Sequence, residues 1–312
     1  MQRNLRAWLR SFLGTALPVF ALLVLFELSA RALGETTVLL NSLGLWMSAQ
    51  EFLLSVAAFA FVNLPLVFAE VFWPGSKTKR NYLAAVKFWL MFLVVRYGWS
   101  KIAISLRASL GVVPLIAWKV EGNAGAPAHP IVIAIGIVVS LGVYDFLYYW
   151  FHRAQHHFAV LWRFHRVHHS IVNLNCLNSY HHVVEDVLRF PFVTIPLAFL
   201  LKVDVPQLVL LSAFVTTWGQ YIHSDTRINL GRLGPVFADN AYHRVHHSNL
   251  EGHRNKNFAA FFPIWDQVFG TYQRYDRDSF PAVGLVDLPP PVTVRDYLFM
   301  PFRKLKGRGV VS

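Results

Sequence analysis

The chain alternates long apolar runs with short polar segments, and the lengths of the runs predict membrane-spanning helices. The runs cover residues 13–30, 52–73, 82–99 and 131–151, and each is close to the length of about 20 residues that crosses a bilayer as an α-helix. The first run follows a basic start and resembles a secretory signal peptide. Its length and the lack of a small-residue cleavage site after it favour a span instead. The pattern therefore predicts about four spans.

Two later regions are apolar but less regular. Residues 102–118 are compatible with an interfacial segment, a re-entrant segment or part of a longer tilted span, and the sequence leaves these three open. Residues 187–201 and 205–222 form two apolar halves around a short polar turn. Because proline removes a backbone donor, the prolines in these halves favour a hairpin that is broken or that enters the membrane only partly. They are Pro191, Pro196 and Pro206.

Composition and charge support a membrane protein. Hydrophobic residues make up 55% of the 312 residues and charged residues 15%, against about 25% charged residues in ordinary soluble proteins. The net charge of +12 does not indicate nucleic-acid binding, because the basic residues lie in short clusters beside apolar runs. Clusters in the first ten residues and at 77–80 predict a cytoplasmic amino terminus. Four spans would then return the following segment to the cytoplasm.

That segment contains nearly all of the histidines, 13 of 14 lying between His152 and His253. Side chains three or four residues apart share one helix face, so each cluster can direct two or three imidazoles at one point. Adjacent histidines differ by about 100° around a helix, which allows them to reach two different ions. The clusters are His152 and His156, then His165, His168 and His169, then His243, His246 and His247. The letters HRVHHS occur in both of the last two.

The number of histidines indicates a binuclear metal site. Eight or nine imidazoles are too many for one ion of four to six ligands, and imidazole suits iron, zinc, copper and nickel. The single cysteine, Cys176, excludes a disulfide within the chain and a cysteine-based metal site. The clusters also lack the Glu-x-x-His pairs of soluble carboxylate-bridged di-iron bundles.

Together with the segment NKNFAAFFPIWDQVFGTY that follows them, the clusters resemble the fatty acid hydroxylase/sterol desaturase superfamily over residues 145–272. The resemblance implies an all-α, polytopic membrane bundle with a histidine-rich helical cap, and the charge pattern places this cap on the cytoplasmic side. It also implies two iron ions that use O2 to hydroxylate or desaturate a lipid. By the same resemblance, the isolated protein can contain zinc in place of iron. The eight clustered histidines match the family's ligands, and His223 in QYIHSD matches its lone histidine.

Two carboxylates are candidates for accepting an imidazole N–H on the side of the ring that faces away from the metal. Asp145 precedes His152 by two helical turns in an apolar span, where an ionisable group is costly and usually functional. We expect it to accept the free N–H of a metal-bound imidazole, with an ion pair to Arg153 or Arg163 as the alternative. Glu185 is a candidate acceptor for another imidazole N–H, and the sequence leaves its role open.

The remaining histidines stay outside the predicted ligand set. His181 and His182 belong to a segment similar to the family's His-Pro-x-Glu, but valine replaces the proline here. His157 and His253 are expected at the surface or behind the ligands, and His129 in a loop.

The predicted activity is hydroxylation of a fatty acyl, aminolipid, sterol-like or ether lipid, with desaturation by the same centre as the alternative. The chain has no dinucleotide-binding glycine loop, so we expect a separate reductase, ferredoxin or cytochrome, or a reduced pterin, to supply electrons. A zinc-dependent membrane hydrolase or a metal-binding protein is the second alternative, although His-Glu-x-x-His is absent. We expect a transmembrane region at 1–130, a catalytic domain at 131–275 and a basic tail at 276–312.

Overall fold

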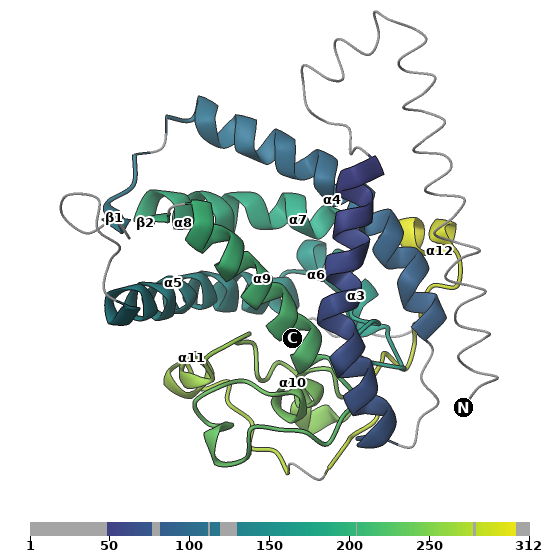
Figure 1. Cartoon of the computed structure of the whole chain (residues 1–312). Coiled ribbons are helices and arrows are strands. Elements are labelled where there is room, and N and C mark those ends of the chain that lie inside the picture. Colours follow the sequence, from purple (N-terminus) through teal and green to yellow (C-terminus); the bar gives the residue numbers. More distant parts are fainter. Residues whose placement is uncertain are drawn as a thin grey trace, which may run out of the picture.

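The computed structural model describes residues 49–76, 82–111, 113–118, 130–203, 205–276 and 279–303. The span expected at 13–30, the basic clusters used for the topology and His129 lie outside these residues. Four long helices dominate the described part of the chain (Figure 1). They are α3 (Ala49–Phe72), α4 (Tyr82–Ser109), α5 (Pro130–His157) and α9 (Val205–Ile222).

Shorter elements connect the long helices and follow them. The α-helices are α6 (Ala159–His169), α7 (Val184–Arg189), α8 (Ile195–Leu200), α10 (Asn240–His246), α11 (Ile264–Val268) and α12 (Val294–Phe299). A π-helix, η2 (Phe190–Thr194), joins α7 to α8, and the 3₁₀ helices are η3 (Gly231–Leu233), η4 (Glu251–His253) and η5 (Met300–Phe302). The expected all-α fold is therefore nearly correct for the described residues. The exception is one parallel pair of strands, β1 (Ile116–Trp118) and β2 (Leu201–Val203).

Two of the described helices are long and apolar enough to cross a membrane. They are Ala85–Ser109 in α4 and Ala134–His157 in α5, while the apolar part of α3, Val56–Phe72, is shorter. The sequence left the role of residues 102–118 open, and the structure continues α4 through them as far as Ser109. Large apolar side chains on these helices point outwards, including Phe61 at 82% exposure, as expected of helices that face lipid.

The prolines of the expected hairpin lie within helices and interrupt them little. Pro191 lies in η2, and the carbonyl of Val187, which loses its usual donor at position 191, accepts the N–H of Phe190 instead. Pro196 and Pro206 lie in the first turns of α8 and α9, where a missing N–H has no intrahelical partner to lose. The chain leaves the helical path at β2, between the two halves.

Glu70, a carboxylate in the apolar run of α3, connects three parts of the chain. Its side chain is fully buried. One carboxylate oxygen accepts the backbone N–H groups of Cys176 and Asp225, both at 2.7 Å, and the other accepts the hydroxyl of Tyr82 at 2.7 Å. Cys176 lies in the loop after α6 and Asp225 in the loop after α9. Glu70 therefore fixes α3 to the two loops that adjoin the histidine clusters.

Replacing Glu70 with alanine is expected to lower the midpoint of thermal unfolding by about 5–10 °C, because two buried N–H groups and a hydroxyl would lose their acceptor. The measurement is thermal unfolding of the detergent-solubilised chain. Leu64→Ala on the same helix is the control, since Leu64 is 58% exposed. Equal shifts in the two variants would contradict the anchoring role.

Candidate metal centre

The histidine clusters lie at the ends of three helices that meet. His152 and His156 occupy the last two turns of α5, and α6 begins directly after Phe158, which has an extended backbone. The HRVHHS repeats end α6 and α10. Helix α10 begins after Asp239, whose side chain accepts the N–H of Tyr242 and caps the first turn.

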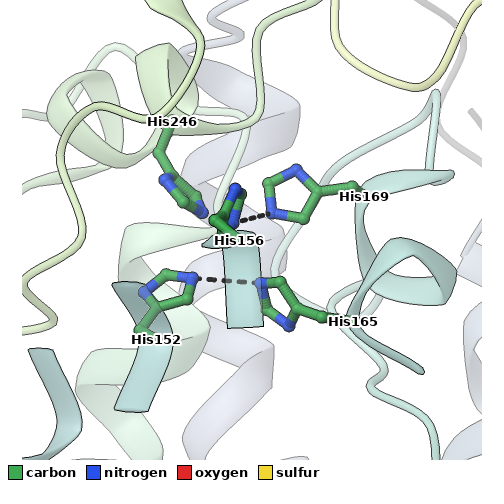
Figure 2. A group of neighbouring side chains, drawn as sticks. All are labelled: His152, His156, His165, His169 and His246. Carbon is green, nitrogen blue, oxygen red and sulfur yellow. Dashed lines mark hydrogen bonds between the residues drawn. The ribbon is translucent and has the colours of Figure 1, made fainter. Parts of the chain in front are cut away.

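Five imidazoles form a first group, and Figure 2 shows their rings turned toward one another. The five are His152, His156, His165, His169 and His246, and one ligand nitrogen of each lies within 4.8 Å of all the others. The Nε2 atoms of His152 and His165 are 3.0 Å apart, and those of His156 and His169 are 3.1 Å apart. All three histidine clusters contribute to this group.

Four imidazoles form a second group: His168, His223, His243 and His247. The Nε2 atom of His223 lies 3.1 Å from that of His168 and 2.9 Å from that of His243. The adjacent histidines are divided between the groups, His169 and His246 in the first, His168 and His247 in the second. All nine histidines that the sequence nominated as ligands are thus brought together in two groups. Their binding of metal stays a prediction.

Hydrogen bonds at the far side of the rings determine which nitrogen faces the group. The Nδ1 atom of His168 lies 3.1 Å from the carbonyl of Tyr180, and that of His223 lies 2.6 Å from the carbonyl of Gly219. A carbonyl only accepts, so each Nδ1 carries the proton and each Nε2 presents a lone pair. Two lone pairs that face each other at 3.1 Å repel unless a cation lies between them. The donor set therefore fits a metal ion.

Peptide carbonyls also hold the Nδ1 protons of two rings in the first group. Nδ1 of His152 lies 2.7 Å from the carbonyl of Phe258, and Nδ1 of His246 lies 2.8 Å from the carbonyl of Lys256. The buried Nε2 of His246 has no hydrogen-bond partner among the described residues. A buried nitrogen without a partner is costly, and a bound metal would satisfy it.

Burial keeps the rings neutral, as metal ligation requires. It lowers the pKa of His223 to about 4, and it holds the pKa of His168 and of His243 well below the usual value, with neighbouring imidazoles adding to the effect. A neutral imidazole offers its lone pair without first losing a proton.

Glu185, whose role the sequence left open, contacts an imidazole. Its carboxylate accepts the Nδ1–H of His165 at 3.0 Å, and the side chain of Gln155 donates to the same oxygen at 2.6 Å. A carboxylate in this position fixes the ring orientation and strengthens the other nitrogen as a ligand.

Asp145 has a different role from the one expected. Its carboxylate accepts the backbone N–H groups of residues 260–262, at 2.8, 3.1 and 2.7 Å, and the predicted bond to His152 is wrong. The ring of His152 donates to the carbonyl of Phe258 in the same segment. Sequence periodicity places Asp145 and His152 on one helix face, but it does not reveal that residues 258–262 run alongside that face and offer peptide groups to both.

His181 lies at the centre although the sequence left it aside. Its ring stacks on that of His168 with centroids 3.7 Å apart, and with His165 and Glu185 it forms a third group of close ligand atoms. The sequence feature that could have indicated this position is the spacing of four residues between His181 and Glu185. His182 packs instead on the ring of Tyr297.

The other two described histidines lie outside the groups. His157 is exposed and His253 is half-buried, as expected for residues at or near the surface.

A cavity of about 440 Å³ lies beside the histidines. Four of the nine grouped histidines line it, His152 from the first group and His168, His223 and His243 from the second, and His181 and His182 line it as well. The wall continues along apolar side chains of η2, α8 and α9, namely Val193, Leu197, Leu211 and Val215. Charged side chains of α4 and α7 also reach the wall. The cavity can therefore bring an apolar chain to the metal groups.

Comparison with known proteins identifies the region that carries these groups. The fatty acid hydroxylase family model matches residues 137–271. Ornithine lipid hydroxylase OlsE of Rhizobium tropici is 30% identical over 154 residues, which is 49% of this chain and 46% of that protein. Human alkylglycerol monooxygenase is 34% identical over 133 residues, 43% of this chain and 29% of its own length. No solved structure matches the chain.

A third relative has a desaturase name. Delta(7)-sterol 5(6)-desaturase erg3B of Aspergillus fumigatus is 30% identical over 176 residues, 54% of this chain and 50% of that protein. The chain spans half or less of the length of these three curated relatives, all of which have names of oxidoreductases. The matched residues 137–271 include both histidine groups. The motif resemblance is confirmed, because residues 137–271 match the fatty acid hydroxylase family model and the three relatives have the names of a hydroxylase, a monooxygenase and a desaturase.

Proposed function

We propose that this chain is an integral-membrane, O2-dependent lipid hydroxylase whose two histidine groups each hold one iron ion. The observation that carries the proposal is the convergence of nine imidazoles into two groups that share a cavity with apolar walls. When bound, the two ions would supply the activation of O2 that breaking an unactivated C–H bond requires.

The residues of the chain itself would orient the imidazole rings, exclude water and position the lipid. Peptide carbonyls and Glu185 hold the protons at Nδ1 of the rings, so that Nε2 is presented to the ions. Leu197, Leu211 and Val215 would hold an apolar chain and exclude water from the reacting carbon. Asp145 keeps residues 260–262 against α5, beside the peptide group that orients His152.

The proposal includes a multi-pass topology with the histidine groups at the cytoplasmic surface. It is supported by α5, which leads without a break from a membrane-length apolar segment into His152 and His156. It also includes a transmembrane region at 1–130, a catalytic domain at 131–275 and a tail at 276–312. In the tail, the carbonyls of Met300 and Pro301 accept hydrogen bonds from Arg166 of α6.

Desaturation of a lipid by the same centre is the second candidate, supported by the sterol desaturase among the relatives. Either reaction needs electrons, for which we propose a separate reductase, ferredoxin or cytochrome, or a reduced pterin.

Iron content tests the division into two groups. The chain loaded with ferrous iron without oxygen is expected to hold two irons, measured by elemental analysis against protein concentration. His168→Ala and His169→Ala remove ligands from different groups, so each is expected to lower the iron content. Because the two groups are separate, Mössbauer spectra of the two variants should retain different iron signals.

His157→Ala is the control for these variants, since His157 is exposed and outside both groups. Zinc retained with no iron under these conditions, or identical residual spectra for the two variants, would argue against two iron sites.

Lipid mass spectrometry tests the reaction. Cells that express the wild-type chain are expected to contain a lipid heavier by one oxygen, or lighter by two hydrogens for a desaturase, that is missing with His168→Ala. Lipid-dependent consumption of O2 by the purified chain with a reductant is the matching measurement in vitro. Unchanged lipids together with no O2 uptake would refute the oxidase proposal.

Glu185 is expected to tune the metal centre without binding an ion. Glu185→Ala should weaken iron binding by about 10- to 100-fold, as loss of a carboxylate behind a ligating imidazole typically does. Glu185→Gln keeps an acceptor oxygen for the Nδ1–H of His165 and should lose less. Iron affinity by competition with a chelator provides the measurement, and an equal loss in both variants would show that the hydrogen bond to His165 is not the cause.

A further inference from the structure

The cavity wall contains four charged side chains besides its histidines: Arg96 on α4, and Glu185, Asp186 and Arg189 on α7. Three of them, Arg96, Asp186 and Arg189, lie in contact with one another. Arg189 donates from Nη2 to one oxygen of Asp186, and Nε of Arg96 lies 3.4 Å from the other. Next to them the rings of Trp99 and Phe190 meet edge to face, with centroids 5.6 Å apart, and hold α4 against this end of α7. We call Arg96, Asp186 and Arg189 the charged triad.

The charged triad has more positive than negative charge. Two guanidinium groups share the single carboxylate of Asp186. The neighbouring carboxylate of the described wall, Glu185, is engaged by His165 and Gln155. Ionisable groups among membrane-length apolar helices are costly, and those that are retained commonly mark a path for a substrate or an ion. With Glu185 the described wall has two arginines and two carboxylates, so it is the guanidinium groups of Arg96 and Arg189, and not the wall as a whole, that are suited to an anion.

The arginines also have the right donors for an oxyanion. The hydrogen bond of Arg189 within the described residues uses one of the five N–H groups of a guanidinium, and its side chain is 27% exposed toward the cavity. The side chain of Arg96 is 52% exposed. A guanidinium presents a planar fork of N–H groups that matches a phosphate or a carboxylate.

The position of Arg189 relates the charged triad to the metal centre. It follows Glu185 by four residues, so the two lie on one face of α7, about 6 Å apart along the helix axis. Glu185 contacts His165 of the first histidine group. An anion bound by Arg189 would thus lie about one helical turn from the level of a metal ligand, and the apolar wall of Leu197 and Leu211 would remain for the lipid chain.

We propose that the charged triad binds the anionic headgroup of the lipid substrate, a phosphate or carboxylate. The reacting carbon then lies within a few bonds of the headgroup and not far along an acyl chain. The position of the reaction rests on the proposed function, whereas headgroup binding does not require turnover.

Binding of oleoyl lysophosphatidate to the full chain in nanodiscs of zwitterionic lipid tests the proposal. Competition with mono-oleoylglycerol, which has the same chain without the phosphate, measures the headgroup contribution. The wild type is expected to prefer the phosphate-bearing lipid by about tenfold or more, the effect of one or two hydrogen bonds to a charged group. Inorganic phosphate, which lacks the chain, is expected to compete only weakly.

Three variants separate recognition from folding. Arg189→Gln should weaken lysophosphatidate binding about tenfold, and Asp186→Asn should strengthen it, because it removes the competing carboxylate. Arg107→Gln, an exposed arginine of α4 outside the cavity wall, should leave binding unchanged. If Arg189→Gln does not fold, Asp186→Asn alone tests the proposal. If the ion pairs only held the helices together, Asp186→Asn would bind lysophosphatidate as well as the wild type or more weakly.

Equal affinity for the two oleoyl lipids, displacement by inorganic phosphate as strong as by lysophosphatidate, or an equal loss with Arg107→Gln would overturn the proposal. Fragmentation of any oxidised product locates the new oxygen, and a position far along the acyl chain would overturn the placement of the carbon. Headgroup preference without O2 uptake would count against the proposed oxidase alone, so the two failures are distinguishable.

Discussion

The structure depends on bringing lone pairs of many imidazoles together in a buried space. The Nε2 lone pairs of His152 and His165, 3.0 Å apart, and those of His168 and His223, 3.1 Å apart, repel one another, and a cation removes that cost. For His168, His223 and His165 the direction of the lone pair is set by the hydrogen bond at Nδ1, where the carbonyls of Tyr180 and Gly219 and the carboxylate of Glu185 hold the protons. The surrounding loops are fixed in turn by buried carboxylates. Glu70 holds the loops after α6 and α9, and Asp145 holds residues 260–262 against α5.

The division of adjacent histidines explains how short motifs can serve two ions. His168 and His169 are neighbours on α6, yet the helical rotation between them turns one toward each group, and His246 and His247 repeat the arrangement at the end of α10. Three members of the second group line the cavity, against one member of the first. A lipid bound along α8 and α9 would therefore approach both proposed ions, with His152 as the ligand of the first group nearest to it on the wall.

The candidate ligands could be predicted from the sequence because their signal is local: spacing on one helix face and a motif that occurs twice. The nearly all-helical character follows from the same kind of pattern. Features that depend on contacts between distant segments could not be predicted. The peptide groups that Asp145 accepts lie 115 to 117 residues away, and the charged triad forms only because α4 packs on α7. His181 was set aside because the valine after His182 departs from the family pattern, whereas its position is determined by stacking on His168.

The central claim is that each histidine group holds its own metal ion. Anomalous X-ray diffraction at the iron edge, from crystals of the chain loaded with ferrous iron without oxygen, tests it most directly. The account predicts two anomalous peaks, one within reach of the Nε2 atoms of His152, His165 and His169, and one within reach of those of His168, His223 and His243. A single peak shared by the two groups, or iron located outside both, would contradict it.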